Sequence, residues 1–172
     1  MEKTIEPAHE IGESLTITDR SQLLSITPEQ AKKIKSLRIE NQVINADFYN
    51  FFESLNTLDS ICFYRYDVRG GFFGVNIECY MLKLTECALT SKNASFILTP
   101  IMAWGGIRIL DLSGNNIGIE PEPFFEWIRT SLLPISNINK LILSDNMFEA
   151  SNINYIISDL KKWEQQNLKV TF

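Results

Sequence analysis

Few residues of the chain have the types and spacing that catalysis requires. The sequence contains a single histidine, His9, within residues 1–13, an acidic stretch that we expect to form a flexible tail. A Ser-His-Asp or Cys-His arrangement would need a histidine in the folded part of the chain. The three cysteines, Cys62, Cys79 and Cys87, form no C-x-x-C pair and lack the spacing of a zinc site. The sequence therefore predicts a protein that is not an enzyme and that binds no metal and no cofactor.

A glycine-rich segment is the other candidate for chemistry. Residues 69–74 read Arg-Gly-Gly-Phe-Phe-Gly. The backbone N–H groups of such a loop can bind a phosphate, but the glycine spacing matches neither a P-loop nor the dinucleotide-binding fingerprint. We favour a structural role, in which Phe72 and Phe73 pack into the core.

Composition narrows the class of protein further. With 172 residues, 45% of them hydrophobic and 22% charged, the chain is long enough for one domain with its own core. The net charge of -5 argues against a general nucleic-acid binder, which neutralises phosphates with basic side chains. The densest apolar stretch, residues 96–104, is too short to span a bilayer, and the odd number of cysteines suits a reducing compartment. We expect a soluble cytoplasmic protein that does not insert into membranes.

An eleven-residue pattern occurs twice with every key position filled. Residues 107–117 and 138–148 both match L-x-x-L-x-L-x-x-N-x-L, where L stands for a large apolar residue. Weaker copies begin at Ile34, Leu58 and Cys79. Their asparagine position holds Gln42, Tyr66 and Cys87. The pattern resembles that of the leucine-rich repeat family, in which cysteine is an accepted substitute for the asparagine.

This resemblance implies an α/β fold, a leucine-rich repeat solenoid. Each unit would supply a short strand to a curved parallel sheet, with helices on the convex side. Residues 14–172 would form this domain, with about six or seven units of the length typical of the family. Positions four and six of each unit would point into the core, because side chains alternate along a strand. Aligned on position four, the predicted units contain residues 15, 37, 61, 82, 110, 141 and 168.

Helical spacing of apolar residues predicts the segments that return from one strand to the next. Such spacing is found in residues 48–55, 124–132 and 151–165. Residues 27–30, Thr-Pro-Glu-Gln, are typical of a capping box at a helix start. Pro100 is expected to interrupt a helix over residues 92–104. Tyr66 cannot replace the asparagine in the same way, so we expect its unit to be locally irregular.

The resemblance also implies a binding surface, because positions three, five, seven and eight of the family pattern face the concave side of the sheet. Carried over to this sequence, these positions supply the candidate partner-binding residues Arg38, Glu40, Tyr64, Arg65, Met81, Lys83, Glu86, Asp111 and Lys140. Aromatic, arginine and charged side chains in this mixture are typical of a protein-binding patch. The alternative is that each is an ordinary solvated strand residue. Cys62 would lie on the same surface as an exposed, unreactive thiol.

We therefore predict a non-catalytic protein–protein interaction module that binds a partner protein through the concave face. It would be similar to intracellular, ribonuclease-inhibitor-like members of the family. Three versions of this role stay open: a secreted bacterial effector acting in a host cell, an adaptor, or the recognition part of a larger enzyme. A GTPase-activating or enzyme-inhibitor protein is the alternative, with Arg38, Arg65 and Arg108 as candidate arginine fingers. The last strand would leave a sheet edge through which a homodimer could form.

Overall fold

A single parallel sheet organises the chain. The structure is a computed structural model that describes residues 13–67, 76–101, 104, 106–133 and 137–172. Its seven strands are hydrogen-bonded in the order in which they occur along the sequence. They are β1 (Ser14–Ile17), β2 (Ser36–Glu40), β3 (Leu58–Tyr64), β4 (Cys79–Thr85), β5 (Ile109–Asp111), β6 (Lys140–Ile142) and β7 (Lys169–Thr171). Every neighbouring pair is parallel, so the chain is an α/β protein of the predicted general class.

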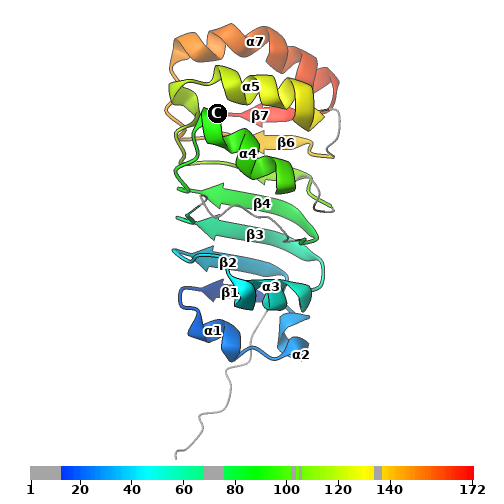
Figure 1. Cartoon of the computed structure of the whole chain (residues 1–172). Helices are drawn as coiled ribbons and strands as arrows, with labels where there is room; N and C mark the ends of the chain where they lie inside the picture. The colour runs from blue at the N-terminus through cyan, green and yellow to red at the C-terminus, as the bar shows by residue number, and fades with distance from the viewer. Residues whose placement is uncertain (1–12, 68–75, 102–103, 105, 134–136) are drawn as a thin grey trace, which may run out of the picture.

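Helical segments connect the strands. Two short helices, α1 (Ser21–Leu24) and α2 (Pro28–Ala31), precede β2, and α3 (Ala46–Glu53) precedes β3. Helix α4 (Ser91–Ile101) lies between β4 and β5. The 3-10 turn η2 (Ile117–Ile119), helix α5 (Glu122–Trp127) and the π-helical segment η3 (Ile128–Leu132) separate β5 from β6. The last helix, α7 (Ala150–Gln165), leads into β7 and lies at the end of the stack, next to α5 (Figure 1).

The register of the sheet follows the sequence repeat. Position-four residues pair in succession from β1 to β6, as Leu15, Leu37, Ile61, Leu82, Leu110 and Leu141. The alignment of these units is therefore confirmed, including the degenerate first one. A parallel register that repeats in this way places side chains with the same position number in rows that run across the strands.

The alignment of the last unit was wrong. Leu141 pairs with Val170 and not with Leu168, so Lys169 occupies position three instead of position five. Leu168 instead follows the end of α7, where Asn167 has a φ of 65° and the Leu168 N–H donates to the Trp163 carbonyl over 2.8 Å. This helix termination buries the Leu168 side chain before the strand begins.

The core is filled from both the strands and the helices. At positions four and six, Leu82, Leu84, Leu110, Leu112, Leu141 and Leu143 are all fully buried. Buried side chains of the helical segments belong to the same core. Phe52 of α3 meets Phe63 of β3 edge to face at 6.5 Å, and Phe125 of α5 stacks on Trp163 of α7 at 5.7 Å. The buried rings of the connecting segments and the inward-facing strand residues thus form one core.

Side chains at position nine link three consecutive units to the units before them. The Asn115 amide donates to the Leu84 carbonyl over 2.7 Å, and the Asn146 amide donates to the Leu112 carbonyl over 2.8 Å. The Cys87 thiol makes the same link to the Phe63 carbonyl at 3.3 Å. These carbonyls all belong to position six of the preceding strand. Position-nine side chains therefore make the same link in three consecutive units.

Position-nine substitutes differ in how they form this link. The Gln42 amide reaches the Thr18 carbonyl, one residue beyond position six of the first unit, over 2.7 Å. Tyr66 is instead buried against Phe63, with ring centroids 5.6 Å apart, and burial raises the pKa of its phenol to about 12. Residues 69–74 and the 1–13 tail, except Glu13, lie outside the described residues, so the predictions made for them remain predictions.

The predicted helix signals have mixed outcomes. Residues 27–30 form the capping box, in which the Gln30 N–H donates to Thr27 Oγ1 and the Thr27 N–H donates to Gln30 Oε1. Helix α4 includes Pro100 and ends one residue later, at Ile101, so the proline does not break the helix where it stands, but the helix does not extend to residue 104. A proline so close to the C-terminal end removes only one N–H of the last turn.

Replacement of Asn115 by alanine tests the position-nine link. The side-chain oxygen of Asn115, Oδ1, also accepts from the backbone N–H groups of Cys87 and Leu89 at 2.9 and 3.1 Å. We expect Asn115→Ala to lower the free energy of unfolding by about 3 kcal/mol, because it leaves buried backbone groups without partners. Urea denaturation followed by circular dichroism measures this change.

The matched control is Asn116→Ala. Asn116 is half-buried, and its backbone N–H donates to the Leu89 carbonyl, a bond that alanine keeps. The control should stay within about 0.5 kcal/mol of the parent protein. Equal effects of the two substitutions would contradict a special role for position nine.

Candidate functional site

The outward face of the sheet carries the candidate residues. This face consists of positions three, five and seven of β2 to β6, whose side chains alternate with the buried ones and remain half-buried or exposed. Row five contains Arg38, Cys62, Lys83, Asp111 and Ile142 in neighbouring strands. Row three contains Ser36, Ser60, Met81, Ile109 and Lys140. Row seven begins with Glu40, Tyr64 and Thr85. Arg65 and Glu86 follow β3 and β4 directly, so the structure places all the predicted residues on or beside one face.

Five of these residues contact one another. We call Arg38, Glu40, Tyr64, Arg65 and Glu86 the Tyr64 cluster. The guanidinium carbons of Arg38 and Arg65 lie 4.4 and 4.9 Å from the centre of the Tyr64 ring. The Tyr64 hydroxyl and Arg65 Nε both donate to Glu86 Oε2, at 3.0 and 2.8 Å. Arg38 Nε forms an ion pair with the Glu40 carboxylate. The cluster thus combines an aromatic ring with two arginines whose positions are already fixed.

The electrostatics of the Tyr64 cluster favour the usual charge states of Arg38, Tyr64, Arg65 and Glu86 at neutral pH. Hydrogen bonds from Arg65 and Tyr64 lower the pKa of the Glu86 carboxyl. Desolvation and the bond to Glu86 raise the pKa of the Tyr64 phenol. The contacts of Arg38 with Glu40 and of Arg65 with Glu86 raise the pKa of both guanidinium groups. The Glu86 carboxyl is therefore ionised at pH 7, and the Tyr64 phenol is neutral.

A left-handed turn follows β2 to β6 at position eight of each unit. The φ angles there are 53° at Asn41, 52° at Arg65, 54° at Glu86, 72° at Gly114 and 57° at Asp145. Residues other than glycine seldom adopt this conformation, although Asn and Asp do so more readily. The turn brings the side chains of Arg65 and Glu86 together at neighbouring strand ends. Sequence reasoning placed these two residues on the surface but missed the turn, for which Asn, Gly and Asp at position eight were the available signal.

Cys62 is the one cysteine on the outward face, since Cys79 and Cys87 are buried. Its Sγ lies 3.5 Å from Arg38 Nη1. Burial nevertheless raises the pKa of the Cys62 thiol, with Arg38 and Lys83 opposing this shift only in part. Burial raises the pKa of Cys79 and of Cys87 to about 12. A thiol with a raised pKa is a poor nucleophile at neutral pH.

The arginines proposed as fingers for a GTPase are held by groups of this chain. Arg38 and Arg65 belong to the Tyr64 cluster and pair with carboxylates. Arg108 Nη1 donates to the Asn137 carbonyl over 3.3 Å. An arginine finger would have to leave these partners to reach a transferring phosphate. The GTPase-activating alternative therefore stays a prediction without a structural feature in its favour.

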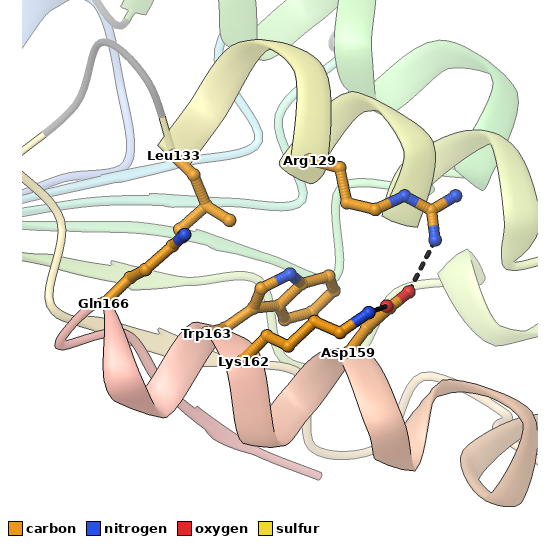
Figure 2. Close-up of a pocket in the computed structure, with 6 residues that line it drawn as sticks. All are labelled: Arg129, Leu133, Asp159, Lys162, Trp163 and Gln166. Atoms are coloured by element: carbon orange, nitrogen blue, oxygen red, sulfur yellow. Dashed lines mark hydrogen bonds and ion pairs between the residues drawn. The ribbon is translucent and has the colours of Figure 1, made fainter.

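A groove lies between η3 and α7. It has a volume of about 450 Å³. Figure 2 shows its lining residues Arg129, Leu133, Asp159, Lys162, Trp163 and Gln166. Asp159 accepts from Arg129 at 2.5 Å and pairs with Lys162 at 3.6 Å. Sequence reasoning missed the groove because its two sides lie far apart in sequence. Its charges satisfy one another, so we interpret it as a seam between helices.

Neither a candidate metal site nor a membrane-spanning helix is found in the part of the chain that the structure describes. It contains no group of three or more His, Cys, Asp or Glu side chains arranged to hold a metal ion. None of its helices combines the length and apolar character needed to span a bilayer. Comparison with protein-family models and with curated proteins finds no match for this chain. The repeat and the outward face are therefore the features of this chain that bear on its function.

Thiol labelling tests the environments of the three cysteines. We expect Cys79 and Cys87 to stay unmodified by N-ethylmaleimide in the native protein, because both are buried. Cys62 should react slowly, and its rate should rise about tenfold per pH unit from about pH 7 to pH 9, since only the thiolate reacts. Intact-protein mass spectrometry measures the extent of labelling. Cys62→Ser is the control and should abolish the native reaction. A Cys62 rate at pH 7 equal to that of a free, unhindered thiol would contradict this account.

Proposed function

We propose that this chain is a leucine-rich repeat protein that binds a partner protein through the concave, outward face of its sheet, without catalysis. Three observations support the assignment to the family. The eleven-residue pattern recurs along the chain, its position-four residues pair from strand to strand, and its position-nine side chains link successive units. Stacked units with a continuous core are the architecture that such a repeat requires.

The Tyr64 cluster is the observation that carries the binding role. Tyrosine and arginine are the side chains most often found at the energetic centre of protein interfaces. Here the tyrosine ring and both guanidinium groups are already ordered by contacts with Glu40 and Glu86. Because a partner would not have to immobilise these side chains, the entropy lost on binding would be smaller. A preorganised anchor of this kind suits recognition.

The absence of catalysis in this proposal is supported by the charge states. A general acid or base works best with a pKa near the operating pH. In the Tyr64 cluster both pKa values move away from neutral pH, since the pKa of Glu86 is lowered and that of Tyr64 is raised. Glu86 therefore presents a constant negative charge to a partner, and Tyr64 presents a neutral hydroxyl. The family resemblance further suggests an intracellular protein of the ribonuclease-inhibitor-like type, with delivery as a bacterial effector as a variant of the same role.

A double substitution on the outward face tests the proposed function. We expect Tyr64→Ala with Lys83→Glu to reduce recovery of specifically captured proteins from a lysate at least about tenfold, as loss of a central anchor does. Quantitative mass spectrometry of the captured proteins measures the ratio between variant and parent. Cross-links from a captured partner should involve Lys83 in the parent protein, because it lies in row five.

The matched control carries changes on α7. Asn154→Ala with Lys161→Glu alters exposed residues on that helix with the same change in charge. The control should capture the partner as the parent does, and circular dichroism should show that both variants are folded. If the outward-face variant captures its partners as well as the parent does, this face is not the binding site.

A further inference from the structure

The C-terminal half of the outward face differs in chemistry from the Tyr64 cluster. We call Met81, Lys83, Ile109, Lys140, Ile142 and Lys169 the lysine-rimmed patch. Its rows are given by the sheet register. Met81, Ile109, Lys140 and Lys169 are neighbours in row three, and Lys83, Asp111, Ile142 and Thr171 are neighbours in row five. Strands β4 to β7, which carry the patch, are consecutive in the sheet (Figure 1).

The register fixes the shape of the patch. Neighbouring strands lie about 4.8 Å apart, and alternate residues on one strand are about 6.6 Å apart. Met81 and Ile109 are therefore direct neighbours, and Ile142 lies about 8 Å diagonally from Ile109. Lys83 and Lys140 are about 12 Å apart at their backbones, with Ile109 and Asp111 of β5 between them. The three apolar side chains are half-buried, whereas Lys140 and Lys169 are exposed.

The charge of the patch is unbalanced. Among the described residues, none forms an ion pair with Lys83, Lys140 or Lys169. Lys140 and Lys169 are direct neighbours across β6 and β7, an arrangement of like charges that disfavours the folded state. The acid within the patch area is Asp111, whose Oδ1 already accepts from the N–H and hydroxyl of Ser113 at 3.0 and 2.5 Å. The patch is thus locally positive on a chain whose net charge is -5.

We propose that the lysine-rimmed patch binds an acidic segment of a protein partner, with an apolar side chain of that segment on Met81, Ile109 and Ile142. This inference rests on the proposed function and adds the chemistry of the partner. Carboxylates on either side of the apolar residue would pair with Lys83 and with Lys140 and Lys169. Burial of the apolar contact supplies affinity, and the complementary charges supply rate of association and specificity.

The chemistry of the patch favours an acidic protein segment over a nucleic acid. Binding to single-stranded nucleic acid combines a basic groove with aromatic rings on which bases stack. The patch has neither an aromatic ring nor an arginine, and three apolar side chains lie beside its lysines. A hydrophobic side chain between carboxylates matches both of its features.

A peptide-binding measurement tests this proposal. The probe is a fluorescein-labelled library of dodecapeptides in which Glu or Asp alternates with Leu, Ile or Phe, and anisotropy reports binding to the full chain. We expect binding that weakens at least about tenfold between about 50 and 300 mM salt, since exposed charge pairs are screened. Libraries with Gln and Asn in place of the acids, or with Ser in place of the apolar residues, should bind at least about tenfold more weakly.

Paired variants assign the binding to the patch. Lys140→Glu with Lys169→Glu should lower the affinity for the acidic library at least about tenfold, and Ile109→Thr with Ile142→Thr should do the same while keeping β-branched residues in the strands. The control, Lys32→Glu with Lys161→Glu, makes the same charge change at exposed positions of the chain outside the patch and should stay within about twofold. Urea denaturation of each variant establishes that it is folded.

Four outcomes would overturn the proposal. These are equal binding of the uncharged library, equal loss in the control variant, tighter binding of a single-stranded DNA dodecamer or of phosphatidylserine vesicles, and occupation of the patch by a second copy of this chain. The proposed function fails separately. If lysate capture depends on Tyr64 and Lys83 but not on Lys140 and Lys169, the protein-binding role stands and the acidic-segment proposal is wrong. If neither pair affects capture, both are wrong.

Discussion

The rest of the structure depends on the hydrogen bonds that the position-nine side chains of three consecutive units make to a carbonyl of the preceding unit. Asn115, Asn146 and Cys87 all reach a position-six carbonyl at the point where the strand ends and the chain turns inward. Without that partner, the carbonyl and the N–H groups of the turn would be buried and unsatisfied, which is costly. Because the link recurs at the same place, each strand is held in register with the one before it. The buried aliphatic side chains then form a continuous core.

The same constraint organises the outward face. Once positions four and six are fixed inward, positions three, five and seven must point outward, because side chains along a strand have period two. The parallel register turns these positions into rows, so the character of the surface depends on which residues stand side by side. At β2 to β4 opposite charges meet around Tyr64 and neutralise one another. At β4 to β7 lysines lie beside apolar side chains in the same rows. One scaffold thus presents a preorganised neutral anchor beside a positively charged apolar patch.

Much of the fold could be predicted from the sequence because the chemistry of the repeat is periodic. Leu110 and Leu141 were aligned by pattern alone, and their pairing in the sheet followed. The prediction failed at Leu168 because two apolar residues two positions apart fit the pattern in either frame, and the end of α7 decides between them. The contacts of Tyr64 with Arg38 and Arg65 could not be predicted, since they depend on rotamers and on the left-handed turn after β3. Lys169 was assigned to the wrong row for the same reason as Leu168.

The connecting segments show why a function is better sought on the sheet than on the helices. Helix α3 has eight residues and α7 has sixteen, yet the strands that follow them keep the same register. The spacing between units is therefore set by the strands and the position-nine links, while segments of different length need only cover the core. Large rings such as Phe125 and Trp163 do this by stacking on each other. A surface built from such variable segments has no common geometry, whereas the outward face keeps a fixed spacing of about 4.8 Å from strand to strand. Substitutions there change the chemistry of recognition without disturbing the core, which is the property that a binding surface needs.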